Sequence, residues 1–423
     1  MLCGTGRAVI NPAKGHCLAG YGLDYPNEGV HDDLCVTALY LSDGQRQSLL
    51  LNFDLIALPG PLNRRIRRAA AAAAGVPLAH VFLTATHTHS GPEVRESYLT
   101  FGRIQTWRRD YNARLVRWAA QAAAEARRTS DPCQLLYNLT EAAENMNRRY
   151  RFPDRRHLYI PDHKQVSGLS DEFVDRELAI VAFRRRGTPN RYKAVVTNYA
   201  AHPLCVGNSS NLVSADYQGE LRRVVEETFT GCHCLATTGA AGDQHPLFPE
   251  GGFEAARRMG GALGRLTVAR TYDAVPVGYD TRLRMDWRDV TLRVKDDATR
   301  RMLPDRAARE AGLGLLKGRR TLRTSVSLLG IGPVLFAGMP GEIVGGLGAM
   351  LKWSSPFLAT CALFQATDDI GYIVTRNQYL WGGMEPASTA FAAGAGERLV
   401  SEAVDAAGSL LRKHPINYPT LGA

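Results

Sequence analysis

Two short apolar runs on either side of an alanine-rich segment constrain the fold most. Residues 48–54 and 80–86 each predict a buried strand, because both are short and almost continuously apolar. Between them, residues 62–74 predict a helix that ends at Gly75-Val76-Pro77. A strand–helix–strand unit of this kind favours two parallel strands and therefore an α/β fold.

The rest of the chain continues this mixture. The pattern predicts helices at 106–128, 215–228, 253–272 and 389–413, and strands at 192–198 and 232–238. Residues 129–192 are interpreted as polar and irregular. Residues 277–340 alternate with the period of a strand and include a hairpin turn at 330–333.

The domain organisation follows from length and uniform composition. A chain of 423 residues can bury a core without disulfides, and no shift in composition marks a second domain. We therefore predict one domain over residues 1–423. Its class is α/β (α+β), with mixed β-sheets covered by helices.

The charge is strongly basic, with 51 Lys and Arg against 41 Asp and Glu and a formal net charge of +10. Such an excess attracts anionic ligands, but it also arises from arginines spread over solvated surfaces. The arginines are scattered rather than interleaved with aromatic residues, so we expect no nucleic-acid partner. The densest run, residues 148–157, is a candidate lining for a site that receives a negative group.

The first residues lack the apolar core of a secretory signal, and no window reaches the length of a membrane span. We therefore expect a cytoplasmic protein with no membrane contact and with its 8 cysteines reduced. Cys232-His233-Cys234 has a metal-like composition. Because no second cysteine pair follows at finger spacing, a strand with buried thiols is the preferred interpretation.

The motif Thr86-His87-Thr88-His89-Ser90 lies at the carboxyl end of a predicted strand, where α/β sheets place their active sites. If the strand geometry persists, His87 and His89 point the same way. Two such imidazoles can bind one metal ion, or one can bind while the other handles protons. A purely structural role for the pair stays open.

Three further segments carry polar residues after apolar strands. His202 follows the strand at 192–198, and nearby Cys205 is either a nucleophile or, as we favour, a buried inert thiol. Asp243 lies in a glycine-rich turn, where it either orients a histidine or caps the turn. Glu342 follows Pro340-Gly341 and either completes a metal site or begins a helix.

These segments, in this order, resemble the catalytic domain of the neutral (alkaline, non-lysosomal) ceramidase family over most of residues 15–400. The resemblance rests on Gly20-Tyr21-Gly22, residues 85–92, residues 145–149, His202, Gly242-Asp243, Pro340-Gly341-Glu342 and residues 379–385.

The resemblance implies a zinc-dependent amidohydrolase, in which zinc activates water for attack on an amide carbon. The implied zinc ligands are His87, His202, Glu342 and Tyr379. His89 is then the acid–base that protonates the leaving amine, and Arg148 stabilises the oxyanion.

Some positions depart from the family pattern. His245 replaces a serine, and Phe391 replaces a tyrosine expected to face the transition state. We expect His245 and Phe391, with Asn147 and Asp243, around the ligands or against the substrate. The secretion signal and C-terminal β-domain of lipid-cleaving members are not expected here.

The sequence thus predicts a cytoplasmic relative that acts on a small-molecule amide, ester or lactone. Two alternatives stay open: an acyltransferase or amide-forming cyclase with the same metal site, and a non-catalytic binder of an anionic ligand. A homo-oligomer is compatible with the sequence.

Overall fold

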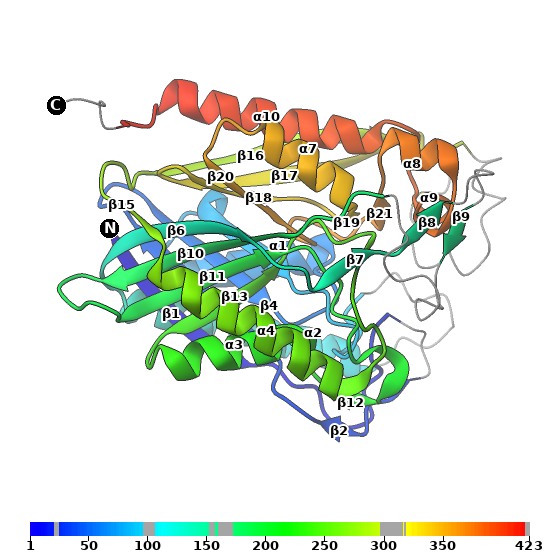
Figure 1. Ribbon diagram of the computed structural model, residues 1–423, viewed down its shortest axis with the longest axis horizontal. Helices are drawn as coiled ribbons and strands as arrows, with labels where there is room; N and C mark the ends of the chain where they lie inside the picture. The colour runs from blue at the N-terminus through cyan, green and yellow to red at the C-terminus, as the bar shows by residue number, and fades with distance from the viewer. Residues whose placement is uncertain are drawn as a thin grey trace.

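The computed structural model describes residues 1–20, 25–95, 106–151, 157–159, 172–296, 316 and 319–418. Figure 1 shows two β-sheets stacked on one another, with helices on their outer faces. The mixed-sheet α/β class predicted from the sequence is confirmed.

Nine strands of the described chain form the large sheet, in the order β13-β11-β10-β6-β1-β3-β4-β5, with β15 paired to β6. Their bounds are β1 Leu2–Val9, β3 Cys35–Ser42, β4 Gln47–Phe53, β5 Val81–Ala85, β6 Asp131–Glu141, β10 Glu177–Arg185, β11 Tyr192–Tyr199, β13 His233–Thr238 and β15 Val275–Val277. The predicted parallel pair is confirmed, since β4 and β5 run parallel, as do β11 and β13.

The second sheet has the order β16-β17-β18-β20, with β16 Leu283–Arg293, β17 Thr321–Ile331, β18 Val334–Gly338 and β20 Ala359–Leu363. The predicted hairpin turn joins β17 to β18. Gly332 has φ +53° there, and a Cβ on it would lie 2.2 Å from the Asp280 carbonyl oxygen, so the turn requires glycine.

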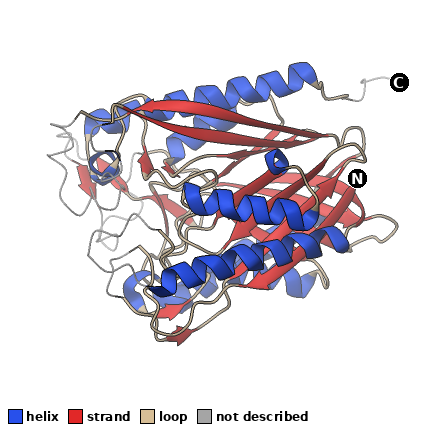
Figure 2. Ribbon diagram, turned by 180° about the vertical axis from the view of Figure 1, so that it is seen from behind, coloured by secondary structure: helices blue, strands red, loops and turns tan. Residues whose placement is uncertain are grey.

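Alternate residues of each strand face opposite layers. Leu50 and Phe336 share one cluster between the two sheets. On the outer faces, Leu51 packs with α1 (Gly60–Ala74) and α2 (Thr106–Arg128), which Figure 2 shows lying across the large sheet.

The other outer faces are covered in the same way. Helices α3 (Asp216–Thr228) and α4 (Gly252–Tyr272) cover β10, β11 and β13, and α7 (Gly345–Ser354) and α10 (Ala395–Lys413) cover the second sheet. None of the helices in the described ranges is long and apolar enough to cross a membrane.

Short elements complete the fold: β2 Gly29–Val30 with β12 Leu212–Val213, β7 Asn145–Asn147 with β14 Gln244–Pro246, β8 Arg149–Arg151 with β9 His157–Tyr159, β19 Glu342–Ile343 with β21 Tyr372–Ile373, the 3-10 turns η1 Leu78–His80 and η3 Gly207–Ser209, and the helices α8 Arg376–Trp381 and α9 Met384–Ser388.

Two sequence predictions were wrong. Residues 129–192 are not all irregular, because β6 and β10 lie within them and pair along nine residues. The polar residues at the ends of β6 and β10 masked the buried residues at the centres of these strands. The last helix begins at Ala395 rather than at residue 389, because Gly394 takes a left-handed φ of +87° and Phe391 bridges to Val294.

Candidate metal centre

His87 reaches the site by a local turn at the end of β5. Its φ is +71°, a rare value for a residue with a side chain. Its Nδ1 lies 2.6 Å from the Ile56 carbonyl oxygen, which can only accept, so Nδ1 carries the proton. This tautomer directs Nε2, the nitrogen that can bind a metal ion, away from the Ile56 carbonyl.

His202 is held in the same way after β11. Its backbone N–H donates to the Gln244 carbonyl, and its Nδ1 donates to the Ala241 carbonyl at 2.5 Å. Burial lowers the pKa of His202 to about 4, although the neighbouring Glu342 carboxylate opposes the shift. At neutral pH the ring is neutral, with Nε2 unprotonated.

Glu342 brings the carboxylate from the second half of the chain. Its Oε2 lies 3.4 Å from Nε2 of His87 and 3.4 Å from Nε2 of His202. Burial opposes ionisation, but the two histidines hold the pKa of this carboxyl well below its usual range. Three lone-pair donors thus converge, and Oε2 of Glu342 and Nε2 of His202 are buried without a hydrogen-bond partner.

This arrangement fits a zinc ion. Zinc is bound tetrahedrally at about 2.0–2.1 Å by nitrogen and oxygen, which separates neighbouring ligand atoms by about 3.3 Å. The two 3.4 Å separations match that value. Buried donors facing one another without hydrogen atoms between them are also the expected state of a site built for a cation.

His89 lies beside this centre. Its ring centroid is 5.0 Å from that of His87 and 5.8 Å from that of His202, and the three side chains can together surround an ion. Burial and the two other histidines hold the pKa of His89 well below its usual value. A Cβ at Gly20 would lie 2.1 Å from its Nδ1, so a glycine is required there.

Tyr379 is not brought to the centre. Its ring faces Lys295, whose Nζ lies 5.3 Å from the ring centroid, and it packs against the cluster around α10. The tyrosine beside the site is Tyr372, which pairs directly with Glu342 between β21 and β19. Burial and Glu342 raise the pKa of its phenol well above the usual value, while Arg148 opposes the shift.

Arg148 is buried and bound on several sides. Its Nε donates to Glu385 at 2.7 Å, and its Nη2 donates to the Gly242 carbonyl at 2.7 Å and to the Tyr372 hydroxyl at 3.1 Å. Its Nη1 lies 3.1 Å from Nε2 of His245. Because arginine only donates, His245 accepts here and is neutral.

The neighbouring Arg149 also binds Glu385, at 2.7 Å. The start of the arginine run therefore pairs with an internal carboxylate, while Arg155 and Arg156 lie outside the described residues. His245, which stands where the family has serine, lies with its ring 5.8 Å from that of His202. It is thus a neighbour of both the metal ligands and Arg148.

Asp243 caps and ties segments rather than orienting a histidine. Its Oδ1 accepts from the backbone N–H of Gly345 at 2.7 Å, where α7 begins, and its Oδ2 accepts from Asn147 at 3.1 Å and from Gln378 at 2.8 Å. Asn147 therefore binds Asp243, which is not itself one of the candidate ligands. Phe391 is buried in the cluster around α10 instead of facing the histidines.

The cysteines behave as structural groups. Burial raises the pKa of the Cys205 thiol well above its usual value, and its Sγ lies 3.6 Å from the sulfur of Met259. Cys232 and Cys234 are buried at β13, and within the described ranges the histidine group is the only cluster suited to a metal. The preferred interpretation of both motifs is confirmed.

Sequence reasoning missed Tyr372, Glu385 and Phe364. The Phe364 ring stands edge-on to the His87 and His202 rings, with centroids 5.1 and 6.0 Å away. Tyr372 lies in the segment 371–379 that ends at Tyr379, but only the pairing of β19 with β21 places it beside Glu342. Figure 1 shows these two strands and β7 gathered at one end of the sheets.

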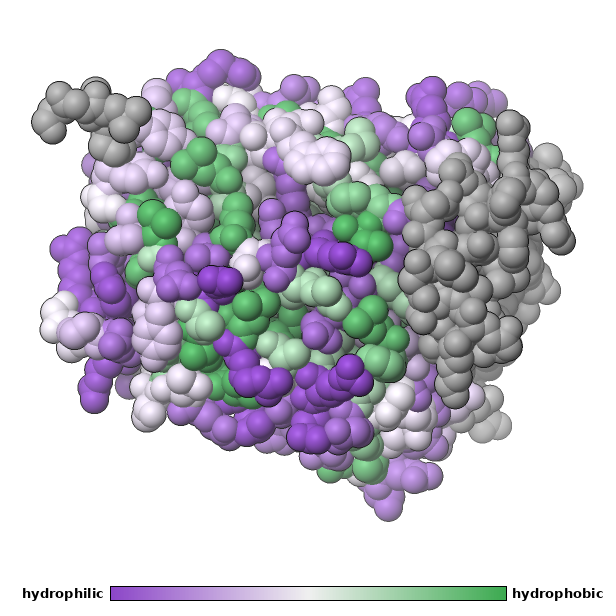
Figure 3. Space-filling view, viewed as in Figure 1, coloured by the Kyte–Doolittle hydropathy of each residue, from purple (hydrophilic) through white to green (hydrophobic). Residues whose placement is uncertain are grey.

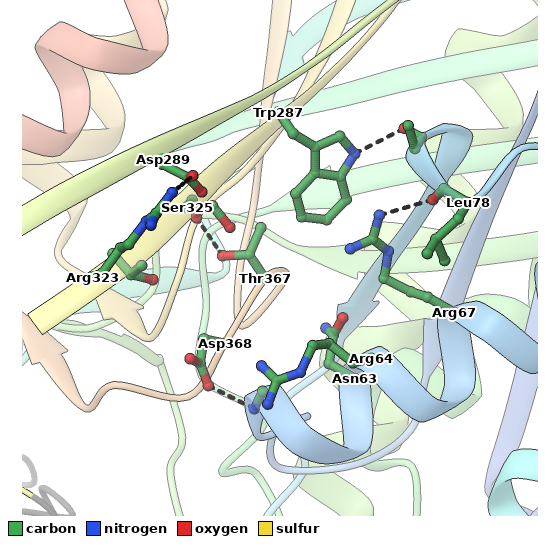
Figure 4. A pocket seen from close by; sticks show the side chains of 13 residues that line it. Asn63, Arg64, Arg67, Leu78, Trp287, Asp289, Arg323, Ser325, Thr367 and Asp368 are labelled. Atoms are coloured by element: carbon green, nitrogen blue, oxygen red, sulfur yellow. Dashed lines mark hydrogen bonds and ion pairs between the residues drawn. The ribbon is translucent and has the colours of Figure 1, made fainter.

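A cavity of about 660 Å³ is lined by residues of α1, β16 and β17 and by none of the candidate ligands. Figure 4 shows it between α1 and the second sheet, with Trp287 and Arg67 on one side and Asp368 at its edge. Asp368 accepts from the Gly60 N–H at 2.6 Å. The next residue, Asp369, approaches Arg95 with a separation of 3.8 Å.

Replacing Gly341 by alanine is expected to displace Glu342. The glycine has φ +64°, and a Cβ on it would lie 2.4 Å from the Gly371 carbonyl oxygen. The left-handed backbone alone costs about 1–2 kcal/mol, and the contact adds to it. Gly187→Ala is the matched control, since Gly187 has φ +75° with nothing near its Cβ position.

We expect Gly341→Ala to lower both the unfolding midpoint and the zinc content, and Gly187→Ala to lower the midpoint alone. Urea unfolding and elemental mass spectrometry measure the two quantities. Equal zinc content in both variants would contradict the role of this turn.

The comparisons with known proteins identify the family and the fold. The family model described as neutral/alkaline non-lysosomal ceramidase, N-terminal, matches residues 2–241. No curated protein matches the chain in sequence.

Two solved structures are similar in fold. One, "Ceramidase complexed with C2", has a TM-score of 0.78 at 16% identity, over 100% of this chain and 77% of that chain. The other, neutral ceramidase from Pseudomonas aeruginosa, has a TM-score of 0.77 at 17% identity, over 100% of this chain and 76% of that chain. By the extent of the family match, the chain belongs to the neutral/alkaline non-lysosomal ceramidase family.

Proposed function

We propose that this protein is a zinc-dependent hydrolase of an amide, or a related acyl bond, in a small molecule. The observation that carries the proposal is the convergence of two imidazoles and one carboxylate with 3.4 Å separations. Zinc bound there would supply Lewis acidity for the substrate carbonyl and lower the pKa of a water toward about 7. The family membership supports the same reaction class.

His89 is assigned to proton transfer. The low pKa caused by burial and by His87 and His202 keeps its ring neutral, so the ring can accept a proton. It can then deliver that proton to the leaving nitrogen or oxygen. His89 is more exposed than the fully buried His87 and His202, which suits a group that must reach the substrate.

Arg148 acts through Tyr372 in this proposal. The resemblance assigns the arginine to the oxyanion, but its donors are directed to Glu385, Gly242 and the Tyr372 hydroxyl. We therefore assign it as a positioning residue. By donating to the phenolic oxygen, it fixes the ring beside Glu342 and directs the phenol proton away from itself.

Tyr372 takes the place that the resemblance gives to Tyr379. We expect Tyr372→Phe to lower turnover by about 10–100-fold, the usual cost of losing a group that supports a metal site. Tyr379→Phe should leave turnover unchanged, since its ring faces Lys295. Steady-state kinetics on the two variants check this, and a larger loss in Tyr379→Phe would reverse the assignment.

The substrate class is tested with a panel of N-acyl amino alcohols, N-acyl amino acids, esters and lactones, including a long-chain ceramide. Reactions run in ¹⁸O-labelled water should yield a carboxylate with one labelled oxygen. Product analysis with an added amine separates hydrolysis from acyl transfer, because an acyl-transfer enzyme would give an unlabelled amide. No turnover of any acyl compound by zinc-loaded protein would overturn the proposal.

The whole of residues 1–423 acts as one catalytic unit in this proposal, because His87 and His202 follow strands of the large sheet and Glu342 follows β18 of the second sheet. A cytoplasmic location is part of the same proposal. All eight cysteines are buried thiols, as expected in a reducing compartment.

A further inference from the structure

Charged side chains gather around the cavity between α1 and the second sheet. Its lining includes three arginines and two aspartates: Arg64 and Arg67 of α1, Arg323 of β17, Asp289 of β16, and Asp368. The face of the molecule seen in Figure 3 intermixes hydrophilic and hydrophobic residues, whereas the cavity collects charged groups around one space. The balance of these charges indicates what the cavity can bind.

Arg67 is fixed in place without being neutralised. Its Nε donates to the Val81 carbonyl at 3.0 Å, and its Nη2 donates to the Leu78 carbonyl at 2.8 Å. Its guanidinium carbon lies 3.7 Å from the centroid of the Trp287 ring. Burial alone lowers the pKa of Arg67 to about 10. The side chain is therefore charged at neutral pH, and its charge has no acidic counterpart among the described residues.

Trp287 makes this wall of the cavity rigid. Its ring also stacks on Phe82, with centroids 5.8 Å apart and planes 15° from parallel. Its Nε1 donates to the Ala79 carbonyl at 2.9 Å. Arg67 is thus held by two carbonyls and by an indole that is itself fixed. A guanidinium ordered in advance loses little freedom when a ligand binds to it.

Arg64 supplies a second guanidinium from the same helix. It lies three residues before Arg67, a spacing that places two side chains on one helix face. Figure 4 shows both side chains extending from α1 into the space beside it. The sequence of α1, GPLNRRIRRAAAAAA, contains four arginines and no acidic residue. The helix therefore contributes positive charge to the cavity without internal ion pairs.

The two aspartates of the lining are already engaged. Asp289 forms an exposed ion pair with Arg323. Asp368 accepts from the Gly60 N–H at 2.6 Å and so caps the first turn of α1. Burial raises the pKa of Asp368 to about 6, which reduces its negative charge near that pH. The positive charge of Arg67 is therefore not offset by either aspartate.

We propose that this cavity binds an organic oxyanion, a carboxylate or a phosphate ester that carries an apolar group. The oxyanion contacts Arg67 and Arg64, because guanidinium groups pair with carboxylates and phosphates through charge-assisted hydrogen bonds. The apolar group packs against Trp287 and Leu78. A volume of about 660 Å³ accommodates a small molecule of this kind. Since none of the candidate metal ligands lines the cavity, this is a second site.

The test is isothermal titration calorimetry of the full chain with phenyl phosphate, benzoate and inorganic phosphate, with phenol as the neutral control. We expect one site for phenyl phosphate or benzoate, weaker binding of inorganic phosphate, and no binding of phenol. The preference between phenyl phosphate and benzoate distinguishes the two oxyanions. Failure of all three anions to bind, or phenol binding as tightly as they do, would overturn the proposal.

Three variants of α1 locate the bound anion. Arg67→Gln should weaken binding by about ten- to a hundredfold, the effect of losing one hydrogen bond to a charged group. Arg64→Gln should weaken it by about three- to tenfold, because this exposed side chain is more strongly screened by solvent. Arg65→Gln is the matched control, since Arg65 is exposed on the same helix and does not line the cavity.

Arg65→Gln should bind the anion like the unmodified chain. Circular dichroism checks that each variant is folded. Should Arg67→Gln fail to fold, the comparison of Arg64→Gln with Arg65→Gln decides the question, because neither changes a buried side chain. Equal affinity in these two variants and the unmodified chain would then overturn the proposal.

The metal centre requires its own control, because a bound metal ion also attracts anions. His202→Ala removes one of the candidate ligands and leaves the cavity lining intact. Its affinity for the anion should equal that of the unmodified chain. Loss of binding in His202→Ala, together with full binding in Arg67→Gln, would place the anion at the metal centre and contradict a second site.

Discussion

His202→Ala is expected to lose the bound zinc and to reduce turnover by about a thousand-fold or more. The imidazole supplies one of three converging donors, and its removal leaves Glu342 facing one histidine. Lewis-acid stabilisation of a carbonyl is worth several kcal/mol, and each 1.36 kcal/mol is tenfold in rate. Zinc content and kcat/KM on the best acyl substrate measure the two effects.

A histidine elsewhere provides the control for this variant. His80 is half-buried and hydrogen-bonds through Nδ1 to the Gln47 carbonyl. It is not one of the residues assigned to the centre. His80→Ala should keep its zinc and its turnover. A His202→Ala protein that is folded by circular dichroism yet retains full activity would exclude metal-assisted hydrolysis at this site.

Arg148→Ala is expected to destabilise the fold by about 3–5 kcal/mol. The guanidinium and Glu385 have side chains that are 3% and 1% exposed, and removing one partner of such a pair strands a buried charge. Glu385 stays paired with Arg149 after the substitution. We therefore expect the loss in free energy of unfolding to lie near the lower end of this range. Urea unfolding of the zinc-free protein measures it without the contribution of the metal.

A surface arginine separates this effect from the loss of an arginine in general. Arg257 pairs with Glu254 on α4, with side chains 67% and 72% exposed. Such pairs contribute little, so Arg257→Ala should leave the unfolding midpoint unchanged. An equal midpoint for Arg148→Ala and the unmodified protein would contradict the buried-pair description.

The fold was largely predictable because its parallel units are locally encoded. The alternation of apolar strand and alanine-rich helix around residues 48–86 identified β4, α1 and β5 correctly. Strands β6 and β10 were missed because each combines a buried centre with charged ends. Strand β6 pairs with β1, β10 and β15, all of them distant in sequence, and no local pattern specifies these partners.

The candidate site was likewise predictable only where a local sequence pattern marks its residues. His87, His202 and Glu342 each follow an apolar strand, and the structure brings them together. The choice between Tyr372 and Tyr379 depends on the register of β21 against β19, which spacing does not encode. Similarly, nothing in the sequence around Asp243 indicated that its carboxylate would accept hydrogen bonds from Gly345, Asn147 and Gln378.

The distribution of the proposed metal ligands along the chain has a consequence for biosynthesis. His87 and His202 are translated in the first half, but Glu342 and Tyr372 emerge only when most of the protein has been made. A nascent chain therefore carries two imidazoles without a carboxylate to neutralise the ion's charge. Zinc acquisition should accordingly be a late, post-translational event that reports completion of the second sheet.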